Sequence, residues 1–347
     1  MKTYQLILAT ALVALASCNK EEVTNTDVNL ESNEIGFNVV NRKATKANDA
    51  IISGTTYATD NTFKVWGWQS PAADFSEFAE DAASNFMSNL TIKWTKGRDN
   101  TRAEAWRNEA NYYYWPFTGK ISFLALHPST VAPSTTGWDA TNKKPQATIA
   151  DYTISDSNKT VDLMFATNEG SRQVDALPMV FSHALSQIEV QVKTDEDYSA
   201  DVAFDVESVT FNNIDLSGDL AYANNAFAWT DNAAQTESWS YYATVLEDIT
   251  KDYQVYGAAN VMIPQAASVA DDPATDAVIE GTYLTIGYSM EQTGSAKLTG
   301  TVNISKPQVW EAGRKYVYTL NFRLNEILFN PSVTDWVTVN VDTINIF

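Results

Sequence analysis

The chain has 347 residues, 44% of them hydrophobic, and a formal net charge of −20 at pH 7. That length suits about two domains with sizeable cores. The negative charge argues against nucleic acid as a partner, because its phosphates would be repelled. One cysteine and two histidines are too few for a thiol- or imidazole-based metal site, so we expect neither a metal nor another cofactor.

Residues 1–17 have the pattern of a bacterial lipoprotein signal peptide. Lys2 supplies a positive charge, and the mostly apolar run at 6–16 is too short to span a bilayer, which takes about 20 apolar residues. Leu15-Ala16-Ser17-Cys18 resembles a lipobox, in which the cysteine is diacylated. We expect Cys18 to carry acyl chains, palmitate among them, that anchor the chain in a membrane. The alternative is an ordinary signal peptide with an incidental cysteine.

A polar stretch at 19–33 then predicts a flexible tether. Its start, Lys20-Glu21-Glu22, resembles the surface-export signal of lipoproteins in Gram-negative anaerobes. The alternative is that this is ordinary tether composition. We favour an outer-membrane lipoprotein that faces outward, at the cell surface.

The first predicted strand covers 34–40. Its alternation places Ile35, Phe37 and Val39 on one face. A basic segment of small residues follows at 41–47 and predicts an exposed loop with trypsin-like cleavage sites.

Beyond residue 48 the pattern is mostly β, rich in Val, Ile, Tyr, Phe and Thr with turn residues between short runs. These runs predict antiparallel sandwiches. The predicted strands are 63–68, 121–126, 161–166, 179–193, 206–214, 283–288, 298–304, 315–323 and 336–347.

One amphipathic helix is predicted in the N-terminal domain. Asp74-Phe75-Ser76-Glu77 resembles a capping box. Apolar residues then recur near helical spacing: Phe75, Phe78, Ala79, Ala82, Phe86, Met87 and Leu90.

No catalytic or phosphate-binding motif occurs, so the sequence does not predict an enzyme. His127 and His183 read as hydrogen-bonded structural histidines rather than as catalytic bases. The acidic run at 195–197 reads as a solvated loop, with a calcium site as the alternative. The aromatic cluster of Trp106 and residues 112–115 reads as core, with a sugar-stacking surface as the alternative.

Together these segments resemble the fimbrillins, the pilins of type V pili, which include the FimA- and Mfa-like proteins. The resemblance covers nearly the whole mature chain. It rests on an ordered set of segments: "FKVWGW" at 63–68, "YYYWPFTGKISFLALHP" at 112–128, "VDLMFA" at 161–166, "VFSHALSQIEVQV" at 180–192, "WEAGRKYVYTLNF" at 310–322 and "FNPSVTDW" at 329–336.

This resemblance implies a lipidated precursor that a trypsin-like protease cuts after a basic residue. The family's cut usually follows arginine, whereas the best positional match here is Lys46, with Arg42 as the alternative. The cut would release the strand that carries Ile35, Phe37 and Val39. Its groove would then accept a strand from the next subunit, so the implied partners are other pilin subunits.

The C-terminal segment is the expected donor strand. Val337, Val339 and Val341 point one way, while Ile344 and Ile346 fall in the opposite phase, which suggests a bulge or two short strands. Asp342-Thr343-Ile344 also matches an O-glycosylation acceptor pattern at Thr343.

The predicted organisation is a signal peptide (1–17), a tether with the removable strand (18–47) and two tandem antiparallel β-sandwich domains that are transthyretin-like (48–186 and 187–347). The predicted function is a structural or accessory pilin subunit for adhesion to an unknown host or bacterial surface ligand. The alternative is a surface glycan-binding lipoprotein of a nutrient-uptake system. A surface hydrolase is a third hypothesis, without any motif.

Overall fold

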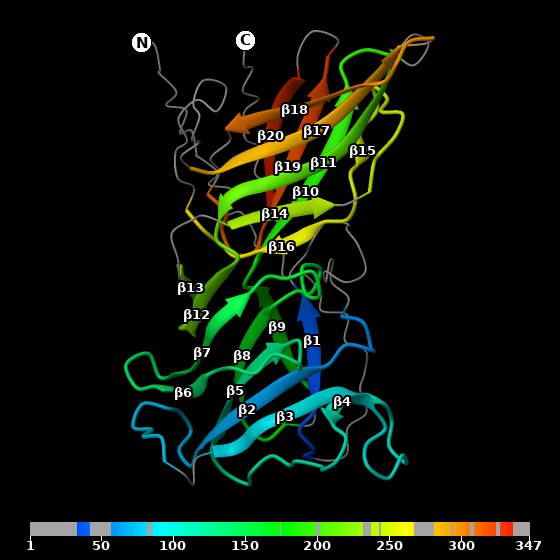
Figure 1. The fold of residues 1–347 in the computed structure, drawn as a ribbon. Helices are drawn as coiled ribbons and strands as arrows, with labels where there is room; N and C mark the ends of the chain where they lie inside the picture. The colour runs from blue at the N-terminus through cyan, green and yellow to red at the C-terminus, as the bar shows by residue number, and fades with distance from the viewer. Residues whose placement is uncertain are drawn as a thin grey trace, which may run out of the picture.

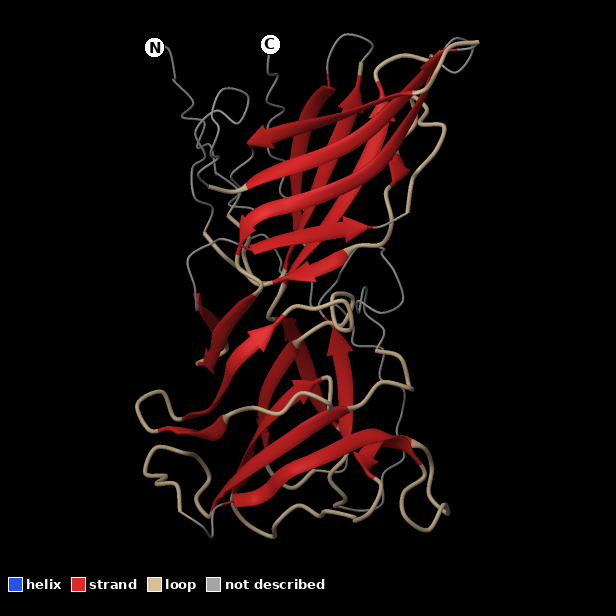
Figure 2. Cartoon of the chain, in the orientation of Figure 1, coloured by secondary structure: helices blue, strands red, loops and turns tan. Residues whose placement is uncertain are grey.

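The computed structural model describes residues 33–41, 57–81, 85–173, 175–198, 202–231, 237–242, 244–266, 281–292, 294–305, 309–323 and 327–335. Within these ranges the chain forms twenty β-strands and no helix, so no helix there is long and apolar enough to cross a membrane (Figure 2). The structure therefore confirms a mainly β chain.

Seven strands close into a barrel in the order β1-β4-β3-β2-β5-β8-β9, at the lower end of Figure 1. All its neighbouring strands are antiparallel except β1 and β9, which run parallel. The strands are β1 (Phe37–Asn41), β2 (Phe63–Ser70), β3 (Asn85–Thr95), β4 (Ala105–Asn108), β5 (Lys120–His127), β8 (Met164–Gly170) and β9 (Leu177–His183).

A four-stranded sheet, β13-β12-β7-β6, lies beside the barrel, on the left of Figure 1, and two further sheets form the upper lobe. One upper sheet has the order β14-β11-β17-β18, and the other has β15-β10-β19-β20 with β16 also paired to β10.

The strands of these three sheets are β6 (Thr135–Asp139), β7 (Lys144–Thr153), β10 (Ser186–Thr194), β11 (Val202–Ile214), β12 (Ser217–Ala223), β13 (Ala226–Asp231), β14 (Glu237–Tyr242), β15 (Gln254–Val255), β16 (Asn260–Met262), β17 (Tyr283–Gln292), β18 (Leu298–Ser305), β19 (Arg314–Phe322) and β20 (Ile327–Asp335).

The upper lobe is a sandwich whose two sheets pack face to face. Phe211 on β11 lies 5.3 Å from Tyr318 on β19, ring centroid to ring centroid. β10 and β19 are parallel neighbours, so the sheets are mostly but not wholly antiparallel.

Strand β5 is buried on both faces and contributes side chains to both hydrophobic cores of the described chain. Phe123 and Ala125 face the interior of the barrel, whereas Leu124 and Leu126 belong to the core that continues into the sheets above. Such a strand reads as a continuous apolar run, as residues 121–126 do.

The predicted helix after Asp74 is wrong. The Asp74 carboxylate accepts hydrogen bonds from the backbone N–H and hydroxyl of Ser76, but this makes only a turn. Phe75 and Phe78 then pack against the indole of Trp138, at ring-centroid distances of 4.8 and 4.7 Å. Residues 85–95 form β3, because pairing with β2 and β4 outweighs a helix-like apolar spacing.

Most predicted strands correspond to observed ones. The apolar run 179–193 is divided between β9 and β10, and residues 336–347 lie outside the described ranges. Strand β12 pairs with β7, so hydrogen bonds cross the expected domain boundary at residue 186. The division into two domains stays a prediction.

We expect Phe123→Ala to lower the free energy of unfolding by about 3–5 kcal/mol, because it leaves a cavity in the barrel core. Phe117→Ala is the matched control, since that ring is 84% exposed and its loss should cost about 0.5 kcal/mol or less. Urea unfolding followed by tryptophan fluorescence measures both variants. Equal losses would contradict the assignment of Phe123 to a tightly packed core.

Candidate functional site

The candidate site is the groove of the barrel that residues 33–41 fill. Strand β1 pairs with β9 along five residues, from Phe37 opposite Leu177 to Asn41 opposite Phe181. On its other side it pairs with β4 at a single position, Phe37 opposite Trp106. The barrel therefore closes through β1, with a long parallel contact on one side and a short antiparallel contact on the other.

Backbone hydrogen bonds also hold the residues just before β1. Ile35 N donates to Tyr113 O at 2.8 Å, and Trp115 N donates to Asn33 O at the same distance. Leu177 N donates to Gly36 O at 2.9 Å. The segment is thus fixed from Asn33 onward.

The apolar side chains of the segment lie in the barrel core. Ile35 and Phe37 are 3% and 1% exposed, and Val39 packs against the same cluster. The ring of Phe37 makes edge contacts with Phe63 and Phe123, at centroid distances of 6.1 and 5.4 Å. Full burial contributes about 1.5–3 kcal/mol for each such side chain, so the segment stabilises the barrel substantially.

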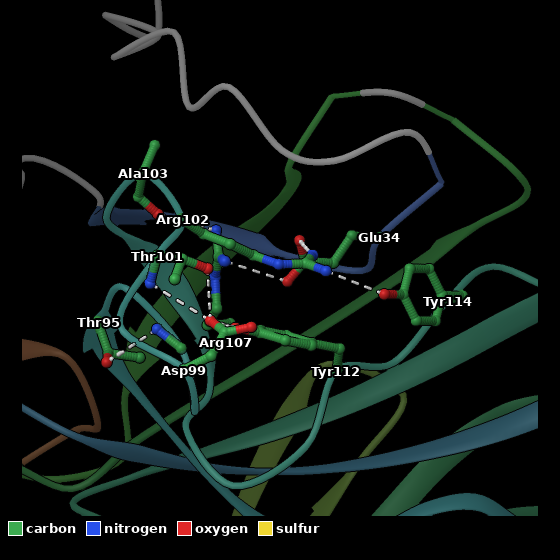
Figure 3. A network of polar contacts seen from close by, with 10 residues as sticks. Glu34, Thr95, Asp99, Thr101, Arg102, Ala103, Arg107, Tyr112 and Tyr114 are labelled. Carbon is green, nitrogen blue, oxygen red and sulfur yellow. Dashed lines mark hydrogen bonds and ion pairs between the residues drawn. The ribbon is translucent and has the colours of Figure 1, made fainter.

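A buried carboxylate anchors the start of the segment. Glu34 is 1% exposed, and its two oxygens face Arg102 Nη1 at 2.5 Å and Arg107 Nη1 at 3.3 Å (Figure 3). Arg107 is itself 1% exposed, and burial lowers the pKa of its guanidinium. Two cations therefore share one carboxylate inside the protein.

Arg102 is held in place by aromatic neighbours. Its guanidinium lies 3.6 Å from the centre of the Tyr112 ring and donates to the Tyr114 hydroxyl at 3.1 Å. Burial opposes the charge on Arg102, but hydrogen bonds to Tyr114 and Glu34 raise its pKa. The hydroxyls of Tyr112 and Thr101 donate to Asp99 and lower its pKa to about 2.

Sequence reasoning missed this ion cluster. Glu34 stands directly before the predicted strand, but nothing in the sequence relates it to Arg102 or Arg107, about 70 residues later. The pairing of β1 with β4 and the antiparallel bridge between Glu34 and Tyr114 bring the three side chains together. The predicted aromatic cluster is divided: Trp106 and Trp115 are core, whereas Tyr112 and Tyr114 line the ion cluster.

The structure brings Ile35, Phe37 and Val39 together, and the other predicted site residues lie outside the described ranges. These are Cys18, Arg42, Lys46, Val337, Val339, Val341, Ile344 and Ile346, together with Thr343. The described part of β1 ends at Asn41, one residue before Arg42, and β20 ends at Asp335, two residues before Val337.

The two histidines are buried and hydrogen-bonded, as expected of structural residues. His127 Nδ1 lies 2.7 Å from the Tyr57 hydroxyl and 3.0 Å from Thr62 O. His183 Nδ1 lies 2.5 Å from the carboxylate of Asp162, which is completely buried. Among the described residues, no three His, Cys, Asp or Glu side chains are grouped as metal ligands, the acidic run at 195–197 included.

His127 predicts a pH dependence of stability. Burial lowers the pKa of its imidazole, and the Asp162 carboxylate opposes this only in part. The unfolded chain, with a histidine pKa of about 6.5, then binds a proton that the folded chain does not. This contribution to stability is fully present above about pH 6.5 and is lost as the pH falls toward the folded pKa.

We therefore expect the free energy of unfolding to fall between about pH 7 and pH 5, and to fall less steeply in His127→Gln. Urea titrations across this range measure both slopes. Identical slopes for the two proteins would contradict a lowered pKa at His127.

Comparison with solved structures shows what this fold is similar to. A fimbrial protein from Bacteroides vulgatus matches 88% of this chain and 99% of its own, at 18% identity and a TM-score of 0.63. A candidate cell adhesion protein from Bacteroides uniformis matches 88% of this chain and all of its own, at 16% identity and a TM-score of 0.51. At these identities the likeness concerns the fold alone.

The curated proteins include no match to this chain. A family model described as fimbrillin-like matches residues 27–336, which is most of the chain and includes every described strand. The chain therefore belongs to the fimbrillin-like family.

Proposed function

We propose that this protein is a pilin subunit that assembles by strand exchange at the cell surface. The precursor is anchored in the outer membrane through Cys18, and a trypsin-like protease cuts it after Arg42 or Lys46. The N-terminal segment then leaves the barrel, and the C-terminal strand of another subunit replaces it. The assembled fimbria serves adhesion to a host or bacterial surface ligand.

The observation that carries this proposal is the way β1 closes the barrel. It contributes a whole strand, and the basic segment that starts at Arg42 follows directly after it. Its pairing with β9 is parallel, the slightly less stable arrangement per residue, and its pairing with β4 covers one position. Family membership and the likeness to fimbrial proteins add support.

Loss of β1 would create a strong demand for a replacement. The rings of Phe63 and Phe123 would lose the Phe37 ring that packs against them. The edges of β9 and β4 would also lose their partner strand, and unpaired edges readily accept another strand. In the same proposal the protein is structural rather than enzymatic, and the residues 48–186 and 187–347 form its two transthyretin-like domains.

The alternative is a surface glycan-binding lipoprotein. Exposed aromatic rings favour it, because such rings stack on sugars: Phe117 is 84% exposed and Tyr253 is 64% exposed. The two hypotheses differ in residues 35–46: a glycan-binding protein would need only a tether there, whereas a pilin needs a removable strand and a cleavage site.

Limited trypsin digestion of the purified, unlipidated precursor tests the proposal. We expect a new N-terminus at Lys43 or Ala47, found by N-terminal sequencing, and a ladder of stable oligomers on an unboiled denaturing gel. A control in which Arg42, Lys43 and Lys46 are all changed to Gln should give neither. A clean cut without a ladder indicates a tip or non-polymerising adhesin, and the absence of a cut favours the glycan-binding alternative.

Deleting residues 337–347 should abolish the ladder while the described part of the chain stays folded by circular dichroism. Replacing Val337, Val339 and Val341 by Asn should have the same effect, because their apolar face would fill the groove. Replacing Ile344 and Ile346 by Asn is the control for the opposite phase. Polymer of normal length from the deleted chain would contradict the assignment of the donor strand.

A further inference from the structure

Strand exchange, on which this inference rests as part of the proposed function, would remove the anion of the ion cluster formed by Glu34, Arg102 and Arg107. Removal of residues 33–41 takes away the carboxylate that Arg102 and Arg107 share. Arg107 would stay behind as a buried cation, which is strongly unfavourable without an anion. An apolar replacement strand would fill the groove but leave this charge unpaired.

The two arginine side chains are held in position by their protein neighbours. Arg107 Nη2 donates to Ala103 O at 3.1 Å, which fixes the guanidinium. Its Nη1 faces the Glu34 carboxylate at 3.3 Å, and its Nε has no hydrogen-bond acceptor in the described part of the chain. Tyr112 and Tyr114 hold Arg102 beside it. Such a pair of fixed guanidinium groups is suited to bind a carboxylate.

We propose that Arg102 and Arg107 form a carboxylate-binding site that binds the side chain of Asp342 in the C-terminal strand of a second copy of this chain. In the N-terminal segment, the acidic Glu34 is followed by apolar residues one, three and five positions later: Ile35, Phe37 and Val39. Read backward from Asp342, apolar residues stand at the same three positions: Val341, Val339 and Val337.

This match is specific within the C-terminal sequence. Residues 327–347 contain two carboxylates, Asp335 and Asp342. Asp335 fits in neither direction, since at least one of its three positions carries a polar residue each way, and Asp342 read forward meets Thr343 and Asn345. The charge therefore fixes both the register and the direction of the incoming strand.

The reversed direction also changes the type of strand pairing. Because β1 runs parallel to β9, a strand in the opposite direction would pair antiparallel with β9 along the whole contact. Antiparallel pairing is slightly more stable per residue. The exchanged strand would therefore gain at the five positions opposite β9, while the one position opposite β4 would become parallel.

Synthetic peptides test the site without any need for polymer. A labelled peptide of residues 33–41 is added in excess to the trypsin-cut full chain, and its exchange into the chain is followed by fluorescence anisotropy. We expect the Glu34→Gln peptide to bind about tenfold more weakly or worse, as for other charged hydrogen-bonded pairs. A peptide of residues 336–345 should compete, and its Asp342→Asn form should compete less by a similar factor. Neutral peptides that bind within about twofold of the charged ones would overturn the proposal.

Polymer formation by full-chain variants tests the same site in assembly. Asp342→Asn should shorten the oligomer ladder, and Asp342→Glu should restore it, since Glu34 is itself a glutamate. The double variant Asp342→Asn with Asn340→Asp keeps net charge and composition but moves the carboxylate by two residues, and it should behave like Asp342→Asn. A normal ladder from both Asp342→Asn and the double variant would overturn the inference and leave the proposed strand exchange intact. Absence of a ladder from the wild-type chain would instead count against the proposed function, and the peptide measurement would still decide the site.

Discussion

The closure of the barrel by β1 is the constraint on which the rest of this structure depends. Residues 33–41 provide a strand between β9 and β4, two elements that are distant from it in sequence. The barrel core includes Phe37 as a central ring, in contact with Phe63 and Phe123. The barrel is therefore closed by a strand whose two neighbours, β4 and β9, lie about 70 and 140 residues later in the chain.

The barrel and the sheets above it share structure through β5. Its Phe123 side chain faces the barrel interior, while Leu124 faces the larger core that reaches the upper sandwich. The pairing of β7 with β12 adds a hydrogen-bonded connection between the two halves of the sequence. Phe123, which contacts Phe37, thus lies on a strand that is packed on both faces. This packing holds β5 in place independently of β1.

Much of the fold could be predicted from the sequence, and the failures have physical causes. Strands such as β2, β5 and β19 are apolar enough to be recognised, and Ile35, Phe37 and Val39 alternate as a half-buried strand should. The segment after Asp74 does not form the predicted helix. A local turn and apolar spacing imitate a helix in the sequence, but cross-strand pairing decides the structure. The contact of Glu34 with Arg107 could not be found, because it depends on strand pairing across about 70 residues of sequence.

The two ends of residues 33–41 are held by different interactions, and this difference affects the order of cleavage and release in the proposed assembly. The basic residues follow the Asn41 end, whereas the buried ion cluster lies at the Glu34 end. In the proposed assembly, a cut after Arg42 or Lys46 would free only the first of these ends. The cut subunit would remain on its lipid anchor through hydrogen bonds and buried side chains alone, with no covalent link. Under the proposed function, cleavage and departure from the membrane would be separate events. The second would wait until a neighbouring chain displaced the strand from the free end toward the ion cluster.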